Sequence, residues 1–322
     1  MKLRGIGLAC SAGALWALSG IMCQILFEEY QVSPEWLASV RLLTAGVLLT
    51  GLNAFQTKAP RRKFSTRDFV GLLLFSLIGM LGVQYTYFKA IQYSGAAIAT
   101  ILQFTGPIFI FIFLVFNKEK KINVLEVLLM VATFVGVFLI VAEGNLQTLN
   151  ISTMGFAMGM ASAVTLAFYT LQPRKLLVRY GEMRIAGLGM LIAGVAFQPI
   201  RPIWHPEFQM DGYSLALVAS IVVFGTAMPF LFQLSSLRFI EASLASVLTV
   251  VEPILATILS VVLFNSHFVA VQIIGFAVVI QINRFCQRRN GSSKNNFISS
   301  PYRYSFLVTW YMIGQKNEKE VE

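Results

Sequence analysis

The sequence predicts an all-α polytopic membrane protein, with ten transmembrane helices arranged as two inverted repeats of five helices. Three observations lead to this prediction. First, the 322 residues are 57% apolar and only 12% charged, whereas about 25% of the residues in an ordinary soluble domain are charged. Second, apolar runs of about 20 residues, the length that spans a bilayer as a helix, recur along most of the chain. Third, the two halves of the chain resemble one another.

The apolar runs do not alternate with polar residues, as the strands of a transmembrane barrel would. Helices are then the remaining way to satisfy every backbone hydrogen bond in lipid. The loops between the runs are too short to hold a soluble catalytic domain. The ten predicted spans cover residues 5–27, 35–56, 68–88, 94–116, 123–142, 152–171, 183–200, 213–233, 242–264 and 267–283.

The first five spans form the first predicted unit, residues 5–143. Span one follows a basic start and lacks a small-residue cleavage site, which favours an uncleaved helix over a signal peptide. Span two carries Arg41 and precedes the basic loop TKAPRRKFSTR. Span three ends in the polar stretch VQYTYFKAIQYSG, span four contains Pro107, and span five closes the unit.

The last five spans form the second predicted unit, residues 152–284. Span six begins with GFAMGMASA, whose small residues at four-residue spacing favour close helix contact. Spans seven and eight are plain apolar runs. Span nine contains an acid followed by a proline, Glu252 and Pro253, and span ten turns polar early, at Gln281. Residues 285–322 match neither unit and are predicted to form a cytoplasmic tail.

Lysine and arginine are distributed unevenly between the two sides of the predicted bundle. With the N-terminus in the cytoplasm, all but three of the 25 lysines and arginines lie on the cytoplasmic side; the exceptions are Arg41, Lys89 and Arg201. This positive-inside pattern predicts a multi-pass protein of the bacterial plasma (inner) membrane with both termini in the cytoplasm. It also explains the net charge of +10 without a nucleic-acid partner.

The repeat is visible as two aligned segments. At an offset of 146 residues, GAAIATILQFTGPI aligns with EASLASVLTVVEPI, so that Pro107 pairs with Pro253 and Gly79 with Gly225. At an offset of 150, SAGALWALSG aligns with ASAVTLAFYT. Because each unit has an odd number of spans, the second unit enters the membrane from the opposite side. Inverted repeats of this kind are common in secondary transporters, whose binding site lies near the midplane between the halves.

Several of these segments together resemble the EamA family of the drug/metabolite transporter superfamily. They are ASVRLLTAG in span two, ATILQFTGPIF in span four and ASVLTVVEPILA in span nine. The resemblance covers about residues 5–280. It implies a ten-helix bundle that exports small metabolites, amino acids or drugs, often by proton antiport. It also supports a role for Arg41, because an arginine is common at that position in the family.

Glu252 is the first candidate for a functional residue, because an ionisable group near the midplane is costly unless it faces a cavity or a partner. Pro253 has no N–H group and clashes with the carbonyl of Thr249, so a kink with a free carbonyl is expected. Pro107 marks the symmetric kink, where Gly106 stands in place of the acid. The alternative is a packed, hydrogen-bonded glutamic acid without a role in transport.

The other candidates are polar or aromatic residues within or at the ends of spans. Each also has a structural interpretation: snorkelling for the arginine, interface anchoring for the end of span three, and packing for the aromatic residues. The candidates for the solute or proton pathway are Arg41, Gln84, Tyr87, Lys89, Gln103, Thr105, Trp16 and Tyr169.

The sequence thus predicts a secondary transporter rather than an enzyme. A phosphate-binding GxxxxGK[ST] loop and the residue patterns of hydrolases and metal sites are absent from the sequence, so neither a cofactor nor a metal is expected. The expected partners are a small-molecule solute and the lipid bilayer, for a monomer or a homodimer. Coupling to the proton gradient is left open. The alternatives are a non-transporting sensor or assembly protein on a transporter fold, and an uncoupled facilitator.

Overall fold

The computed structural model describes residues 2–56, 62–142, 152–206, 208–264, 270–279 and 281, and the predicted tail at 285–322 lies outside them. The described residues form helices joined by turns, without a β-strand. In the first half the helices are α1 (Lys2–Glu29), α2 (Pro34–Gln56), α3 (Thr66–Leu74), the π-helix η1 (Phe75–Leu81), α4 (Gly82–Gln103), α5 (Gly106–Phe116) and α6 (Val124–Val141). In the second half they are α7 (Thr153–Leu171), α8 (Arg174–Tyr180), α9 (Glu182–Phe197), α10 (Gly212–Val222), the π-helix η3 (Val223–Ala227), α11 (Met228–Ser236), α12 (Ala242–Leu248) and α13 (Val251–Phe264).

Eight helices within the described ranges are long and apolar enough to cross a membrane. They correspond to the predicted spans one to six, eight and nine. The predicted seventh span is α9, whose 16 residues give about 24 Å, short of the roughly 30 Å hydrocarbon core. The tenth predicted span includes the shorter apolar helix Ala270–Val279, and most of its remaining residues are outside the described ranges.

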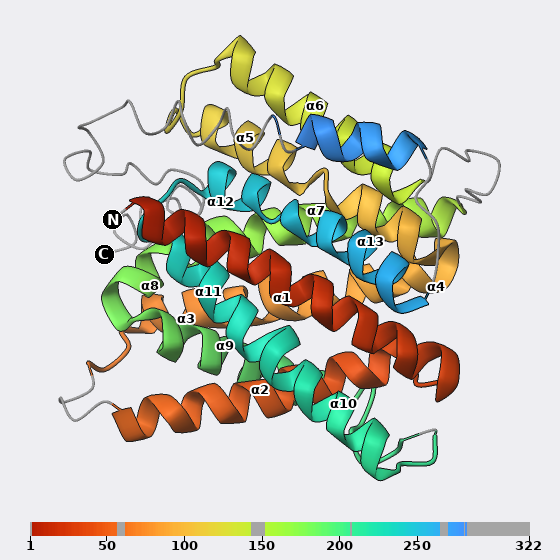
Figure 1. The fold of residues 1–322 in the computed structure, drawn as a ribbon. Coiled ribbons are helices and arrows are strands. Elements are labelled where there is room, and N and C mark those ends of the chain that lie inside the picture. The colour runs from red at the N-terminus through yellow and green to blue at the C-terminus, as the bar shows by residue number, and fades with distance from the viewer. Residues whose placement is uncertain are drawn as a thin grey trace, which may run out of the picture.

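The helices pack as one bundle, with α6 at one edge and α2 at the opposite edge (Figure 1). Within it α1 packs against α11 and α13, α7 packs against α4 and α5, and α2 packs against α9. The contact of α1 with α13 and that of α7 with α4 therefore join segments from different halves of the sequence. Most buried side chains between these helices are small or branched apolar residues, which allow close packing in lipid.

Two glycines bring α2 and α9 into backbone contact. A Cβ atom on Gly46 would lie 2.3 Å from the backbone nitrogen of Leu191, and one on Gly194 would lie 2.5 Å from the Cα atom of Leu43. The two contacts are equivalent in the internal repeat, because an offset of 148 residues takes Gly46 to Gly194 and Leu43 to Leu191. The crossing leaves no room for a side chain at position 46 of α2 or at position 194 of α9.

We expect Gly46→Ala to lower the free energy of unfolding by about 2 kcal/mol, because the added methyl group must push two backbones apart. Gly51→Ala, in the same helix, is the control, since a Cβ atom there meets nothing within 4 Å and alanine is the better helix former. Thermal unfolding in detergent compares the two variants. Equal midpoints would contradict the tight crossing.

Candidate functional site

A helix break lies where the sequence predicts a kink before Pro253. Helix α12 ends at Leu248 and α13 begins at Val251. The carbonyl of Thr249 is not free, contrary to the prediction from the sequence, because across the break it accepts a hydrogen bond from the N–H of Glu252 at 2.8 Å. The Thr249 hydroxyl donates to the carbonyl of Ser246 at 2.7 Å. The break puts Glu252 in the first turn of α13, where the partial positive charge of a helix N-terminus favours a carboxylate.

Arg41 lies in α2 and is buried, with 8% of its surface exposed. Its Nε donates to the hydroxyl of Thr226 at 2.8 Å, and its NH2 group donates to the carbonyl of Gly225 at 2.9 Å. Both acceptors belong to the π-helix η3. Because a π-helix departs from the usual hydrogen-bond ladder, its carbonyls are available to a partner from another helix. These two hydrogen bonds fix Arg41, which belongs to the first half of the chain, to a helix of the second half.

The charges of Arg41 and Glu252 act on one another. Tyr87 lies within reach of both charges, and Cys23 lies within reach of the charge of Arg41. The hydroxyl of Tyr87 is hydrogen-bonded to Thr100 at 2.9 Å. Within the described residues the two opposite charges form no direct ion pair. The bundle thus holds a cation and an acid near each other in its interior, without direct contact between them.

Aromatic side chains from four helices adjoin each other. The ring centroid of Phe230 is 5.3 Å from that of Trp16 and 5.6 Å from that of Tyr169, and Tyr169 stacks on Phe75 at 5.9 Å. The Tyr169 hydroxyl is buried and has no hydrogen-bond partner within the described part of the chain, and the same holds for Oε1 of Gln233. The predicted aromatic pair is therefore joined through Phe230.

Neither Phe230 nor Gln233 was among the residues that the sequence singled out. A signal for Gln233 exists in the repeat, since the offset of 146 places it opposite Tyr87. Its burial, with 3% of its surface exposed, becomes visible only when the helices are packed. Buried polar atoms in folded proteins nearly always have a partner, so these two atoms indicate a place for water or a ligand.

The remaining candidates lie in α4 and in the break that follows it. Lys89 forms an ion pair with Glu35 at 2.7 Å, at the end of the bundle where α2 begins. Gln84 is buried in α4. Gln103 and Thr105 flank the other helix break, between α4 and α5, where the Thr105 hydroxyl donates to the carbonyl of Leu102.

The break before Pro107 has no charged group where Glu252 stands in the other half. Gly106 occupies that position, and the side chain of Leu166 lies 2.8 Å from where its Cβ would be. The offset of 148 takes Arg41 to Gly189, where an atom of the Phe75 ring lies 2.5 Å from the position that a Cβ atom would occupy. The charged pair is thus confined to one of two similar environments, and apolar side chains fill the other.

The fold and these interior groups define a multi-pass membrane protein that holds a buried arginine on a π-helix and an acid at a helix break. A family model described as the EamA-like transporter family matches residues 3–142 and 153–281. The chain belongs to this family.

Similar proteins of known sequence and structure agree with that assignment. An uncharacterized inner membrane transporter of Salmonella typhimurium (strain LT2), YicL, is 31% identical over 84% of this chain and 90% of its own. The threonine/homoserine exporter RhtA of Escherichia coli (strain K12) is 23% identical over 65% of this chain and 68% of its own. A protein of known crystal structure shares the fold with a TM-score of 0.75, at 16% identity, over 91% of this chain and 100% of its own. The family and the named relatives are transporters rather than enzymes.

Proposed function

We propose that this protein is a secondary transporter that exports a small organic solute across the bacterial inner membrane by alternating access. The single observation that carries the proposal is that each half of the chain places one ionisable group in the interior of the bundle: Arg41, hydrogen-bonded to η3, and Glu252, at the break before α13. Charged groups in a membrane interior are costly and usually mark a solute or ion pathway. In this proposal ten spans form two inverted repeats, with both termini in the cytoplasm.

The inverted repeat is supported by irregular features at matching positions. The π-helices η1 and η3 contain Gly79 and Gly225, which the offset of 146 aligns. The same offset aligns the two helix breaks, which lie before Pro107 and Pro253. Helix α1 packs on the break of the second half, and α7 packs on the break of the first. An exchange of conformation between two such halves would open a central site to one side and then to the other.

An amino acid is the solute class that best complements the charged pair. Its carboxylate matches the guanidinium group of Arg41, which binds carboxylates with a planar set of donors, and its ammonium group matches Glu252. The aromatic side chains of Trp16, Tyr169 and Phe230 offer an apolar wall for the rest of the molecule. The name of the relative RhtA, a threonine/homoserine exporter, supports the same class.

A thermal-shift screen tests this proposal, followed by flux measurements in proteoliposomes. We expect amino acids, L-threonine and L-homoserine among them, to raise the unfolding temperature, and preloaded solute to drive counterflow of labelled solute. Saturable counterflow would favour a carrier over an uncoupled channel. A folded protein without flux or stabilisation by any member of a metabolite library would favour a non-transporting sensor instead.

Tyr169→Phe separates a solute contact from simple packing. Removing an unpaired buried hydroxyl is expected to leave the free energy of unfolding unchanged or to raise it by about 1 kcal/mol, while the response to solute weakens. Tyr87→Phe is the matched control, because that hydroxyl has a hydrogen bond to Thr100 and its loss should lower stability. A Tyr169→Phe variant with an unchanged solute response would remove this hydroxyl from the site.

A further inference from the structure

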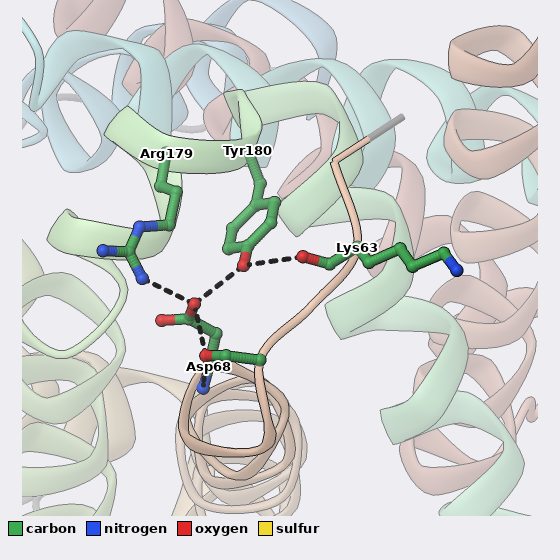
Figure 2. Close-up of polar contacts among 5 residues, drawn as sticks. Lys63, Asp68, Arg179 and Tyr180 are labelled. Carbon is green, nitrogen blue, oxygen red and sulfur yellow. Dashed lines mark hydrogen bonds and ion pairs between the residues drawn. The ribbon is translucent and has the colours of Figure 1, made fainter. Parts of the chain in front are cut away.

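Each end of the bundle carries a tyrosine that is hydrogen-bonded to an aspartate of the other half. At one end the hydroxyl of Tyr180, the last residue of α8, donates to Asp68 Oδ2 in α3 at 2.7 Å (Figure 2). At the other end the hydroxyl of Tyr30, just after α1, donates to Asp211 Oδ2, just before α10, at 3.0 Å. Each of these bonds joins the two halves of the chain.

The two tyrosines occupy matching positions in the repeat. The offset of 150 takes Tyr30 to Tyr180. The backbone turns with a positive φ immediately after each of them, 55° at Gln31 and 83° at Gly181. A non-glycine residue rarely adopts such a φ, so the shared turn is a specific feature of both ends.

The two aspartates belong to matching helix caps. Ser65 caps α3 and accepts a hydrogen bond from the N–H of Asp68. Asp211 caps α10 and accepts one from the N–H of Ser214. The offset of 146 takes Ser65 to Asp211 and Asp68 to Ser214, so the serine and the aspartate have exchanged places. In both caps the aspartate is the residue that binds the tyrosine.

The two ends differ in the charges beside the tyrosine. Arg179 adds an ion pair to Asp68 at 2.6 Å, and the Asp68 side chain is only 12% exposed. Figure 2 shows Arg179 and Tyr180 converging on this carboxylate. The offset of 150 takes Arg179 to Glu29, whose negative charge acts on Tyr30. The Asp68 end therefore has a cation on its carboxylate, and the Asp211 end has an anion beside its tyrosine.

Asp211 is ionised at neutral pH, and Glu29 adds a second negative charge beside the tyrosine at this end. The hydrogen bond that Asp211 accepts from the N–H of Ser214 holds the pKa of this carboxyl below its ordinary value. The side chain is also exposed, so water competes for the hydrogen bond with Tyr30. The contact at the Asp211 end is accordingly the weaker of the two.

We propose that Tyr180–Asp68 and Tyr30–Asp211 are the two gates of this protein, and that Arg179 and Glu29 bias it toward the conformation closed at the Asp68 end. The proposal rests on the alternating-access function proposed above. Under the predicted topology the stronger gate is cytoplasmic, so the resting protein would face outward. The bias lies in the charges at positions 179 and 29, because the tyrosine and the aspartate are present at both gates.

Paired spin labels can follow both gates at once, without a known solute. Positions 67 and 178 flank the Asp68 gate, and the repeat takes them to positions 213 and 28 at the Asp211 gate. All four residues are exposed. Cysteines would be introduced in pairs, Arg67→Cys with Val178→Cys and Glu28→Cys with Tyr213→Cys, after replacement of the three native cysteines. Electron–electron distance measurements then give the populations of the open and closed states of each gate.

Arg179→Glu is expected to shift the Asp68 gate toward open by about tenfold, the ratio that 1.4 kcal/mol produces, and to shift the Asp211 gate toward closed. Glu29→Arg should shift both gates in the same directions, and the double variant should shift them furthest. Arg238→Gln is the matched control, since its ion pair with Glu182 is equally exposed, with a similar distance of 2.7 Å, but lies within one half. It should move neither gate.

Unchanged distances in folded Arg179→Glu and Glu29→Arg variants would overturn the proposal, and so would two gates that open together. The distances are measured without solute, so they are independent of transport. Opposite shifts of the two gates in a protein without flux would support the gates and reject the transport function. Flux in a protein whose distances stay fixed would reject the gates alone.

Discussion

Glu252→Gln is expected to reduce solute flux driven by a pH gradient at least tenfold, in proteoliposomes that contain the purified protein. Glutamine keeps the size and hydrogen-bonding capacity of the side chain but cannot bind and release a proton. If Glu252 couples the solute to protons, then counterflow exchange should persist in the variant, because exchange needs binding and conformational change without net proton movement. The comparison of the two fluxes identifies the step that is lost.

Glu241→Gln provides the control for this variant, because Glu241 is an acid of the same half that forms a surface ion pair with Lys120 at 2.8 Å. That ion pair lies outside the charged group of Arg41 and Glu252, so its loss should leave both fluxes near the wild-type values. Normal flux driven by the pH gradient in a folded Glu252→Gln variant would remove Glu252 from the coupling role. Loss of both fluxes would instead assign Glu252 to solute binding.

Arg41→Gln is expected to abolish the response to solute and to lower the free energy of unfolding by about 3 kcal/mol. The variant removes two buried hydrogen bonds from the guanidinium group to η3, and a hydrogen bond to a charged group contributes about 1.5–3 kcal/mol. Arg238→Gln is the reference, since an exposed ion pair contributes about 1 kcal/mol or less. Chemical denaturation and solute-dependent thermal shifts measure the two effects.

The double variant Arg41→Gln/Glu252→Gln tests whether the two charges act as a pair. Because each single variant leaves the other charge uncompensated, the double variant should lose less stability than the sum of the single losses, by about 0.5–3 kcal/mol. Additive losses would show that Arg41 serves only to hold α2 against η3. In that case Arg41 would be assigned to packing, and the solute site would have to be sought around Glu252 alone.

The kink before Pro253 was predictable from the sequence, because proline lacks an N–H group and cannot continue the hydrogen-bond ladder. The membrane class was predictable for a similar reason, since the length and apolarity of a helix are properties of a continuous segment. The π-helices at Gly79 and Gly225 were not predictable. A change from one hydrogen-bond ladder to another depends on packing against neighbouring helices, as the hydrogen bonds between Arg41 and η3 illustrate.

The proximity of Arg41 and Glu252 in the bundle was likewise not predictable from the sequence. More than 200 residues separate them in the sequence, and this separation gave no sign of proximity. The structure brings their charges within mutual influence through the packing of helices from both halves. Gln233 was overlooked because its position near a predicted span end resembled an ordinary interface residue, whereas in the bundle it is buried without a partner for Oε1.

The sequence by itself determined the class of this protein, the position of its two proline breaks and the acid that distinguishes one from the other. These are local properties, fixed by the polarity of each segment and by the chemistry of proline and glutamate. Only the tertiary structure decided which residues meet: Arg41 and the π-helix η3, Leu166 and Gly106 at the break of the first half, and a tyrosine and an aspartate at each end. Such pairings depend on how separate helices cross in space, and a linear pattern carries little information about that crossing.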